Sequence, residues 1–263
     1  MRNAKELVLE REELLKALLT NFSTHSDVLG TFLGGSLAAE NADEFSDIDL
    51  RLVLADVCPK SEFLKELINL PGVLFVETLA ESYVVLHFDC FVKVDIFVYY
   101  KRELAPSVWL KKIRIFKDDG FLARIYEQSK LLIYHLHQEE FNFFLMKFYA
   151  YLHEFYRRNQ RGERNYRDEC GIFLKNCLVA FWYMELGEQP NGLGDWSKYE
   201  GKRSKLTTYQ QNWLRKYDIF TDGNVFLREI SLTVWLVLQK ISQHYQLEFD
   251  EEKFKKVVEK IKC

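Results

Sequence analysis

The hydrophobic pattern changes from short, strand-like runs in the first part of the chain to long, helix-like stripes in the rest. Residues 5–22 repeat Leu and Ala at helical spacing, which predicts an opening amphipathic helix. Apolar runs rich in β-branched and aromatic residues then predict five strands, within VLGTFLGGS (28–36), IDLRLVLA (48–55), GVLFVETL (72–79), YVVLHFDC (83–90) and FVKVDIFVYY (91–100). A short helix, KSEFLKELINL, is expected after the second strand, and turn-like breaks join the last three strands into a meander.

After about residue 105 the strand-like runs disappear. Apolar residues of segment 139–161 recur at the i, i+3, i+4, i+7 spacing of a packed helix. Further helices are expected at 164–187, 207–216, 224–245 and 250–261. The aromatic stripes favour core packing over base stacking, because aromatic side chains carry so much apolar area. The pattern predicts an α+β protein with a sheet-containing domain, 1–110, and an all-helical C-terminal domain, 111–263.

Composition and charge narrow the class of protein. Of the 263 residues, 48% are hydrophobic, which is ample for a packed core and excludes a disordered chain. A net charge of −3 argues against a protein that coats nucleic acid. Residues 1–120 carry 14 basic and 20 acidic side chains (14 − 20 = −6), whereas residues 121–263 carry 22 and 19 (22 − 19 = +3). An acidic half and a basic half are a plausible setting for a metal ion and a polyphosphate.

The lack of a recognisable targeting signal and the spacing of the cysteines predict a protein of the cytoplasm. No stretch approaches the roughly 18 apolar residues of a membrane span, and the N-terminus lacks the apolar centre of a signal peptide. The five cysteines are odd in number and form no Cys-x-x-Cys pair. A disulfide framework or a zinc site is therefore not expected.

The segment with the clearest chemistry begins at Gly34-Gly35-Ser36 and ends at Asp47-Ile-Asp49. Side chains at i and i+2 of a strand share a face, so both carboxylates should project together. Adjacent carboxylates repel each other unless a cation lies between them, and Mg²⁺ prefers oxygen ligands. The two glycines leave backbone amides accessible for a phosphate, and Ser36 is placed to cap a following helix. A Gly-Gly-Ser motif alone is usually a turn, and an Asp-x-Asp motif alone is usually part of the surface. The prediction therefore depends on the order in which the two motifs follow each other along the chain.

A third carboxylate, Asp95, lies within the later apolar run KVDIFVYY. An ionised Asp is costly to bury without a partner. Two partners would explain it: a metal ion shared with Asp47 and Asp49, or a salt bridge to a Lys or Arg of the helical half. The upstream motif favours the metal ion.

Gly35-Ser36, Asp47, Asp49 and Asp95 resemble the signature of the nucleotidyltransferase superfamily, whose fold is shared by DNA polymerase β and the antibiotic nucleotidyltransferases. The resemblance covers about residues 28–100. The two-part layout most resembles the aminoglycoside adenylyltransferases, on size and architecture alone. The resemblance implies a mixed sheet that binds two Mg²⁺ ions through the three aspartates, and a nucleoside triphosphate, with ATP expected, held partly by Gly34, Gly35 and Ser36.

The implied reaction transfers a nucleoside monophosphate, AMP if the donor is ATP, to a hydroxyl of a small molecule and releases pyrophosphate by a two-metal mechanism. An aminoglycoside-like antibiotic is the acceptor that the acidic half would attract. The alternatives are a protein or RNA acceptor, of which the modest charge disfavours RNA, and a non-catalytic or antitoxin-like nucleotide-binding module. The sequence leaves the oligomeric state open.

Leu37 stands where many members of the superfamily carry a basic residue after the serine. Neutralisation of the phosphates is therefore expected from the metal, from backbone amides or from the helical domain. Lys202, Arg203 and Lys205, in a loop after a Gly-rich turn, are the candidates for reaching the nucleotide's β- and γ-phosphates. Glu169 is the candidate for a carboxylate on the acceptor side.

Overall fold

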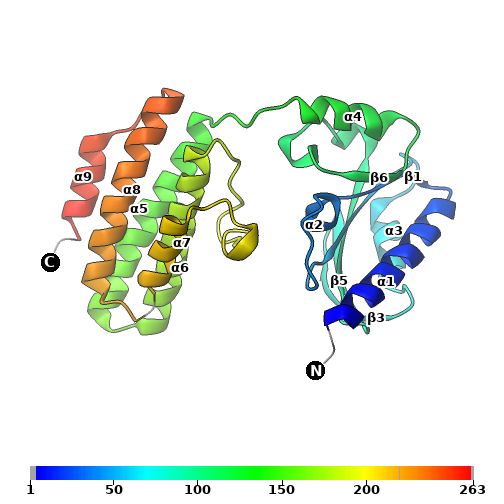
Figure 1. Ribbon diagram of the computed structural model, residues 1–263, viewed down its shortest axis with the longest axis horizontal. Helices are drawn as coiled ribbons and strands as arrows, with labels where there is room; N and C mark the ends of the chain where they lie inside the picture. Colours follow the sequence, from blue (N-terminus) through cyan, green and yellow to red (C-terminus); the bar gives the residue numbers. More distant parts are fainter. Residues whose placement is uncertain (1–3, 219, 262–263) are drawn as a thin grey trace. The chain divides into compact units, whose positions relative to one another are not determined.

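The computed structural model describes residues 4–218 and 220–261, and the chain divides into two compact units, Met1–Ile133 and Tyr134–Cys263 (Figure 1). The first unit holds a mixed six-stranded sheet and the second is helical, which confirms the predicted α+β class. The domain boundary expected after residue 110 falls inside the first unit, because a further strand and helix follow it there.

The strands of the first unit lie in the order β3-β4-β5-β2-β1-β6. Neighbours are antiparallel except β2 and β5, which run parallel. The strands are β1 (Val28–Leu33), β2 (Ile48–Leu54), β3 (Val73–Leu79), β4 (Tyr83–Phe88), β5 (Lys93–Tyr100) and β6 (Arg114–Lys117). The helices are α1 (Ala4–Thr24), α2 (Gly35–Ala38), α3 (Lys60–Leu67) and α4 (Phe121–Lys130). The β3-β4-β5 meander was predicted, whereas the expectation that no strand follows residue 105 is wrong, because β6 pairs with β1.

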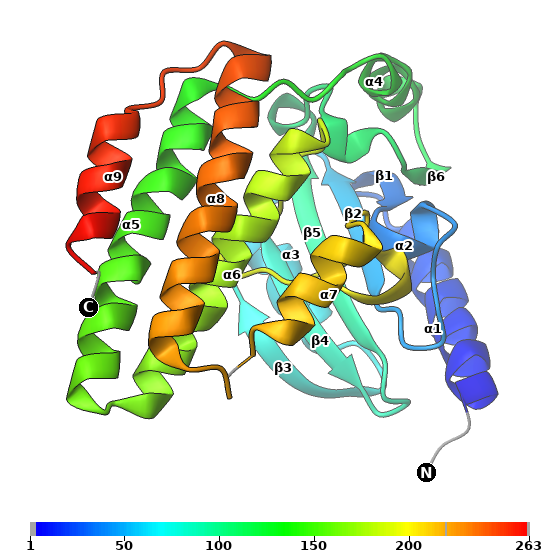
Figure 2. The same cartoon turned by 60° about the vertical axis from the view of Figure 1, so that its left-hand side comes forward.

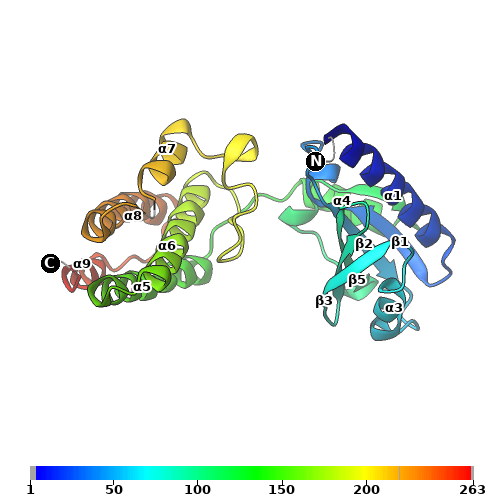
Figure 3. The same ribbon diagram turned by 90° about the horizontal axis from the view of Figure 1, so that it is seen from below.

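The two faces of the sheet differ in what covers them. Alternate residues of β2, β4 and β5 pack against α1 and α3, as with Leu50 and Ile96 in the cluster that contains Phe22 and Phe63 (Figure 3). On the opposite face, Val53 and Phe32 pack with Leu122 of α4. The rest of that opposite face carries polar and aromatic side chains of intermediate exposure, and we call it the open face.

The second unit is built of α5 (Gln138–Arg161), α6 (Arg164–Glu185), α7 (Thr208–Lys216), α8 (Gly223–Tyr245) and α9 (Glu251–Glu259). Figure 2 shows α5, α6, α8 and α9 side by side. Phe148 stacks on Phe254 and meets Phe181 edge-on, so the aromatic stripe serves the core as predicted. In the described ranges, no helix is both long and apolar enough to cross a membrane.

Candidate active site

Three aspartates lie together on the open face of the sheet. Asp49 of β2 and Asp95 of β5 are directly paired in the parallel register, so their side chains project from the same face. Asp47 lies just before β2, and it approaches Asp95 because one ammonium, that of Lys93, contacts both carboxylates. The parallel pairing of β2 with β5 thus joins two carboxylates that are far apart in sequence.

The glycine-rich turn between β1 and α2 is fastened to β2. The Gly34 N–H donates to the Asp49 carbonyl oxygen at 2.9 Å. Gly35 has a φ of +61°, and a Cβ there would lie 1.7 Å from Asp49 Oδ2. A glycine is therefore required, because only a residue without a side chain lets this carboxylate lie against the turn.

Ser36 does not cap the helix, contrary to the sequence prediction. Its residue lies inside α2 and is buried, whereas Gly34 occupies the N-cap position and provides no side-chain hydrogen bond. Ser36 therefore lacks the capping role that its position in the sequence suggested.

The loop that leads into Asp47 is held from α1. The buried Arg11 donates from Nη1 to the carbonyl oxygens of Asp43, at 2.7 Å, and Ser46, at 3.1 Å. The Ser46 hydroxyl donates to Asp43 Oδ1 at 3.0 Å and accepts from the Asp43 N–H at 2.9 Å. These bonds fix the backbone immediately before Asp47.

Lys93 places its ammonium among the carboxylates. Its Nζ lies 3.1 Å from Asp47 Oδ2 and 3.3 Å from Asp95 Oδ2. The lysine precedes Asp95 by two residues on β5 and therefore shares the open face. The sequence-based alternative for Asp95, a salt bridge to a cation of the helical half, is thus wrong about the source of the cation, because Lys93 comes from the same strand as Asp95.

Burial and neighbouring charges set the protonation of this cluster. Burial raises the pKa of Asp95, Lys93 lowers it, and the charges of Asp49 and Asp47 raise it again, leaving it above the ordinary value. Burial lowers the pKa of Lys93, but hydrogen bonding to Asp47 and the charges of both partners outweigh this effect and raise it. One ammonium thus faces three carboxylates, and the cluster keeps an excess of negative charge.

The donor set of this cluster suits a hard divalent cation. Asp95 Oδ1 is buried and has no hydrogen-bond partner, and carboxylate oxygens are the ligands that Mg²⁺ prefers. In the described ranges, no group of three or more Asp, Glu, His or Cys side chains is arranged so that it could hold a metal ion. The Lys93 ammonium contacts the oxygens of Asp47 and Asp95 in this arrangement.

Arg51 is a residue of the open face that the sequence reasoning missed. It follows Asp49 by two positions on β2, and its guanidinium lies against Gly34 and over the ring of Phe97. The period-2 alternation that joins Asp47 to Asp49 also includes Arg51, so the signal was present in the strand itself.

The candidate residues of the helical unit are on its surface. Lys202 and Arg203 belong to the 3₁₀ turn Gly201–Arg203 and are exposed, as is Lys205, which pairs with Glu188. Glu169 is exposed on α6. Their proposed roles toward a nucleotide and an acceptor remain predictions.

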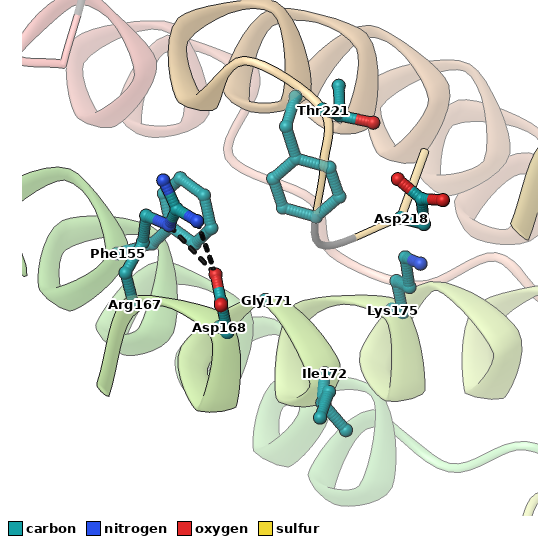
Figure 4. Close-up of a pocket in the computed structure, with 9 residues that line it drawn as sticks. Phe155, Arg167, Asp168, Gly171, Ile172, Lys175, Asp218 and Thr221 are labelled. Atoms are coloured by element: carbon teal, nitrogen blue, oxygen red, sulfur yellow. Dashed lines mark hydrogen bonds and ion pairs between the residues drawn. The ribbon is translucent and has the colours of Figure 1, made fainter. Parts of the chain in front are cut away.

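A small cavity of the helical unit is lined by charged groups near Glu169 but not by Glu169 itself (Figure 4). Asp168 lines it and pairs with Arg167, while Lys175 and Asp218 lie at its other end. The cavity volume of about 30 Å³ has room for about one water molecule. It is too small for an antibiotic-sized acceptor.

No protein-family model matches the chain, and no curated protein matches it in sequence. Among solved structures, the chain is similar to a nucleotidyltransferase-like protein from Exiguobacterium sibiricum, with 13% identity and a TM-score of 0.42 over 88% of this chain and 77% of the other. It is also similar to an aminoglycoside 6-adenyltransferase from Bacillus subtilis (14% identity, TM-score 0.31, all of both chains). A STING-associated CdnE c-di-GMP synthase from Capnocytophaga granulosa has 13% identity and a TM-score of 0.29 over 98% of this chain and 79% of its own. The resemblance of the chain to the nucleotidyltransferase superfamily therefore rests on the motif of Gly35-Ser36, Asp47, Asp49 and Asp95.

Proposed function

We propose that this protein is a nucleotidyltransferase that transfers AMP from ATP to a hydroxyl group of a small molecule. The acceptor oxygen forms a bond to the α-phosphorus. The bond from the α-phosphorus to the oxygen that bridges it to the β-phosphorus breaks, and pyrophosphate leaves with that electron pair. The acceptor proton passes to a carboxylate of the site.

One observation carries this proposal: Asp47, Asp49 and Asp95 project from one face of the sheet beside the Gly34-Gly35 turn. Three carboxylates at one place repel each other and raise the free energy of the fold unless a cation compensates them. Such a cluster is therefore better explained by binding than by stability.

Asp47, Asp49 and Asp95 would hold two Mg²⁺ ions. When bound, the ions would neutralise the triphosphate and the charge of the leaving pyrophosphate. The lack of a side chain at Gly35 leaves room for the carboxylate of Asp49, and Arg11 holds the loop before Asp47. Positioning of these groups before substrate arrives is a main source of rate enhancement in such reactions.

Asp95 is suited to accept the proton of the acceptor hydroxyl. Its Oδ1 is buried without a hydrogen-bond partner, and its pKa is raised by burial. A carboxylate with a raised pKa is a stronger base at neutral pH than an ordinary one.

We propose a polycationic acceptor such as an aminoglycoside. Residues 1–120 carry 20 acidic against 14 basic side chains, and three of the acidic residues, Glu40, Asp43 and Glu44, lie shortly before Asp47 in the sequence. Acidic surfaces concentrate cationic ligands and raise their association rates.

The test is pyrophosphate release from ATP with Mg²⁺ or Mn²⁺, screened against aminoglycosides, lincosamides and cellular metabolites. The proposal expects release that requires both the cation and one acceptor, and that is abolished in Asp49→Asn. The variant should keep the wild-type circular dichroism spectrum, because Asp49 is not part of the core. Release at the wild-type rate by Asp49→Asn contradicts the proposal, as does no release with any acceptor.

The ion pairs of Lys93 favour one second candidate, a non-catalytic nucleotide-binding module. In that case the ammonium would stay on Asp47 and Asp95 permanently and take the place of a metal ion. ATP would then raise the melting temperature equally with and without Mg²⁺, and no acceptor would cause pyrophosphate release.

A further inference from the structure

Arg51 is held in a narrow slot beside the three aspartates. Its guanidinium carbon lies 5.2 Å from the centre of the Phe97 ring, and a Cβ on Gly34 would lie 1.9 Å from Arg51 Nη1. Nη1 also approaches the Asp49 carbonyl oxygen at 3.4 Å. The guanidinium is thus confined between an aromatic ring and the backbone of the glycine-rich turn.

The strand register places Arg51 in a row adjacent to that of the carboxylates. Arg51 pairs with Phe97 across β2 and β5, and Phe97 pairs with Tyr83 across β5 and β4. Phe97 and Tyr83 are stacked at 5.3 Å, which supports the ring that carries the guanidinium. The next row is Asp49 and Asp95, about 6.6 Å further along the strands by the rise of two residues.

In the described ranges, no carboxylate neutralises the charge of Arg51. Within residues 4–218 and 220–261, Arg51 forms no ion pair, although Asp47 and Asp95 lie on the same face and both pair with Lys93. Arg51 is also only partly buried. A permanently charged group that is held still and lacks a counter-ion is a site for an anion.

We infer that Arg51 binds the phosphates of the nucleotide, supplying from β2 the cation that the turn lacks at Leu37. This inference rests on the proposed function. A guanidinium presents a planar fork of N–H donors that matches two phosphate oxygens, and the Phe97 ring fixes its plane. The preorganised side chain loses little further freedom on binding, so more of the interaction energy appears as affinity.

The slot also explains why Gly34 is a glycine. Its φ of −110° is open to any residue, so backbone conformation does not demand glycine there. A methyl group on Gly34 would overlap the Arg51 guanidinium, so the glycine leaves room for the guanidinium in this position. Gly34→Ala therefore moves the guanidinium without removing its charge, which makes it an independent test of position.

The test is calorimetric titration of ATP, inorganic tripolyphosphate and adenosine, with Mg²⁺ present, into wild type, Arg51→Met, Arg51→Lys and Gly34→Ala. Methionine keeps apolar contact with Phe97 and removes the charge. Arg102→Met is the matched control, because Arg102 also lies over a ring, Tyr100, but at the opposite end of β5. Melting temperatures establish that each variant is folded.

Arg51→Met is expected to weaken ATP and tripolyphosphate at least about tenfold, the usual effect of losing a charged hydrogen-bond donor, and to leave adenosine unchanged. Arg51→Lys and Gly34→Ala should show smaller losses, and Arg102→Met none. If wild type binds ATP and tripolyphosphate and Arg51→Met binds them equally well, the inference is overturned and the proposed function stands. If wild type binds neither ATP nor tripolyphosphate, the inference and the proposed function are both contradicted.

Discussion

Removal of Lys93 should strengthen metal binding at the three aspartates. Its ammonium lies 3.1 Å from an oxygen of Asp47 and 3.3 Å from an oxygen of Asp95. A divalent cation on these aspartates needs the same oxygens, so the lysine competes with it. Lys93→Met removes the competing charge, and its linear apolar side chain approximates the lysine stem.

The size of the effect follows from the charges and their spacing. Two unit charges about 4 Å apart interact by about 1 kcal/mol in water. A divalent cation and an ammonium at that spacing therefore repel each other by about 2 kcal/mol, which corresponds to about 30-fold in affinity. The water value is a lower bound, because the Lys93 side chain is only 32% exposed and charges interact more strongly in a partly buried site. Salt weakens the effect by screening, so low ionic strength is preferred.

The assay is calorimetric titration of Mn²⁺ and Mg²⁺ into the nucleotide-free protein. Lys93→Met is expected to bind both ions about 30-fold more tightly than wild type. Lys101→Met is the control, because Lys101 also pairs with an aspartate, Asp119, but beyond the other end of β5. Equal or weaker affinity in Lys93→Met would refute the view that the lysine occupies a cation site.

Three further predictions concern the site and its surroundings. Because the pKa of Asp95 is raised above its ordinary 3.8, its contribution to stability is largest below that pH and is lost as the pH rises through the raised pKa. Asp95→Asn should therefore unfold at higher urea than wild type at pH 8, with a gap that narrows toward pH 4; a constant gap contradicts this. Gly35→Ala should cost about 1–2 kcal/mol of unfolding free energy through its left-handed backbone and abolish pyrophosphate release by displacing Asp49. Gly120→Ala, with a φ of +91° and open space at its Cβ, should cost a similar amount and keep activity; equal activity in both variants refutes the role of Gly35. Lys205→Glu should raise the apparent KM for ATP, and an unchanged KM after charge reversal at each of the three basic residues of that loop would discard their role.

The sequence predicted the elements with strong periodicity. The five strands before residue 105 and the long helices α5, α6 and α8 have clear apolar patterns, and the structure contains all of them. The sequence pattern did not predict β6 or α4. β6 is only four residues long and includes two basic residues in Arg-Ile-Phe-Lys, so its apolar pattern is weak, and the strand is stabilised by its pairing with β1.

The carboxylate cluster was predictable only in part. The spacing of Asp47 and Asp49 fixes their common face, but the approach of Asp95 depends on the parallel register of β2 and β5, which neither strand's pattern encodes. Lys93 and Arg51 were each two positions from a candidate aspartate, and the same alternation would have placed them on the open face. The sequence does not predict the difference between their contacts. Lys93 pairs with two carboxylates, whereas the guanidinium of Arg51 lies against Gly34 and the ring of Phe97 and pairs with neither.

The most direct measurement is anomalous diffraction from crystals grown with Mn²⁺ and a non-hydrolysable ATP analogue. The account predicts a manganese peak bonded to oxygens of Asp47, Asp49 and Asp95, with the Lys93 ammonium moved away from them. A structure in which the analogue is bound, no manganese lies at these aspartates and Lys93 still contacts Asp47 and Asp95 would contradict it.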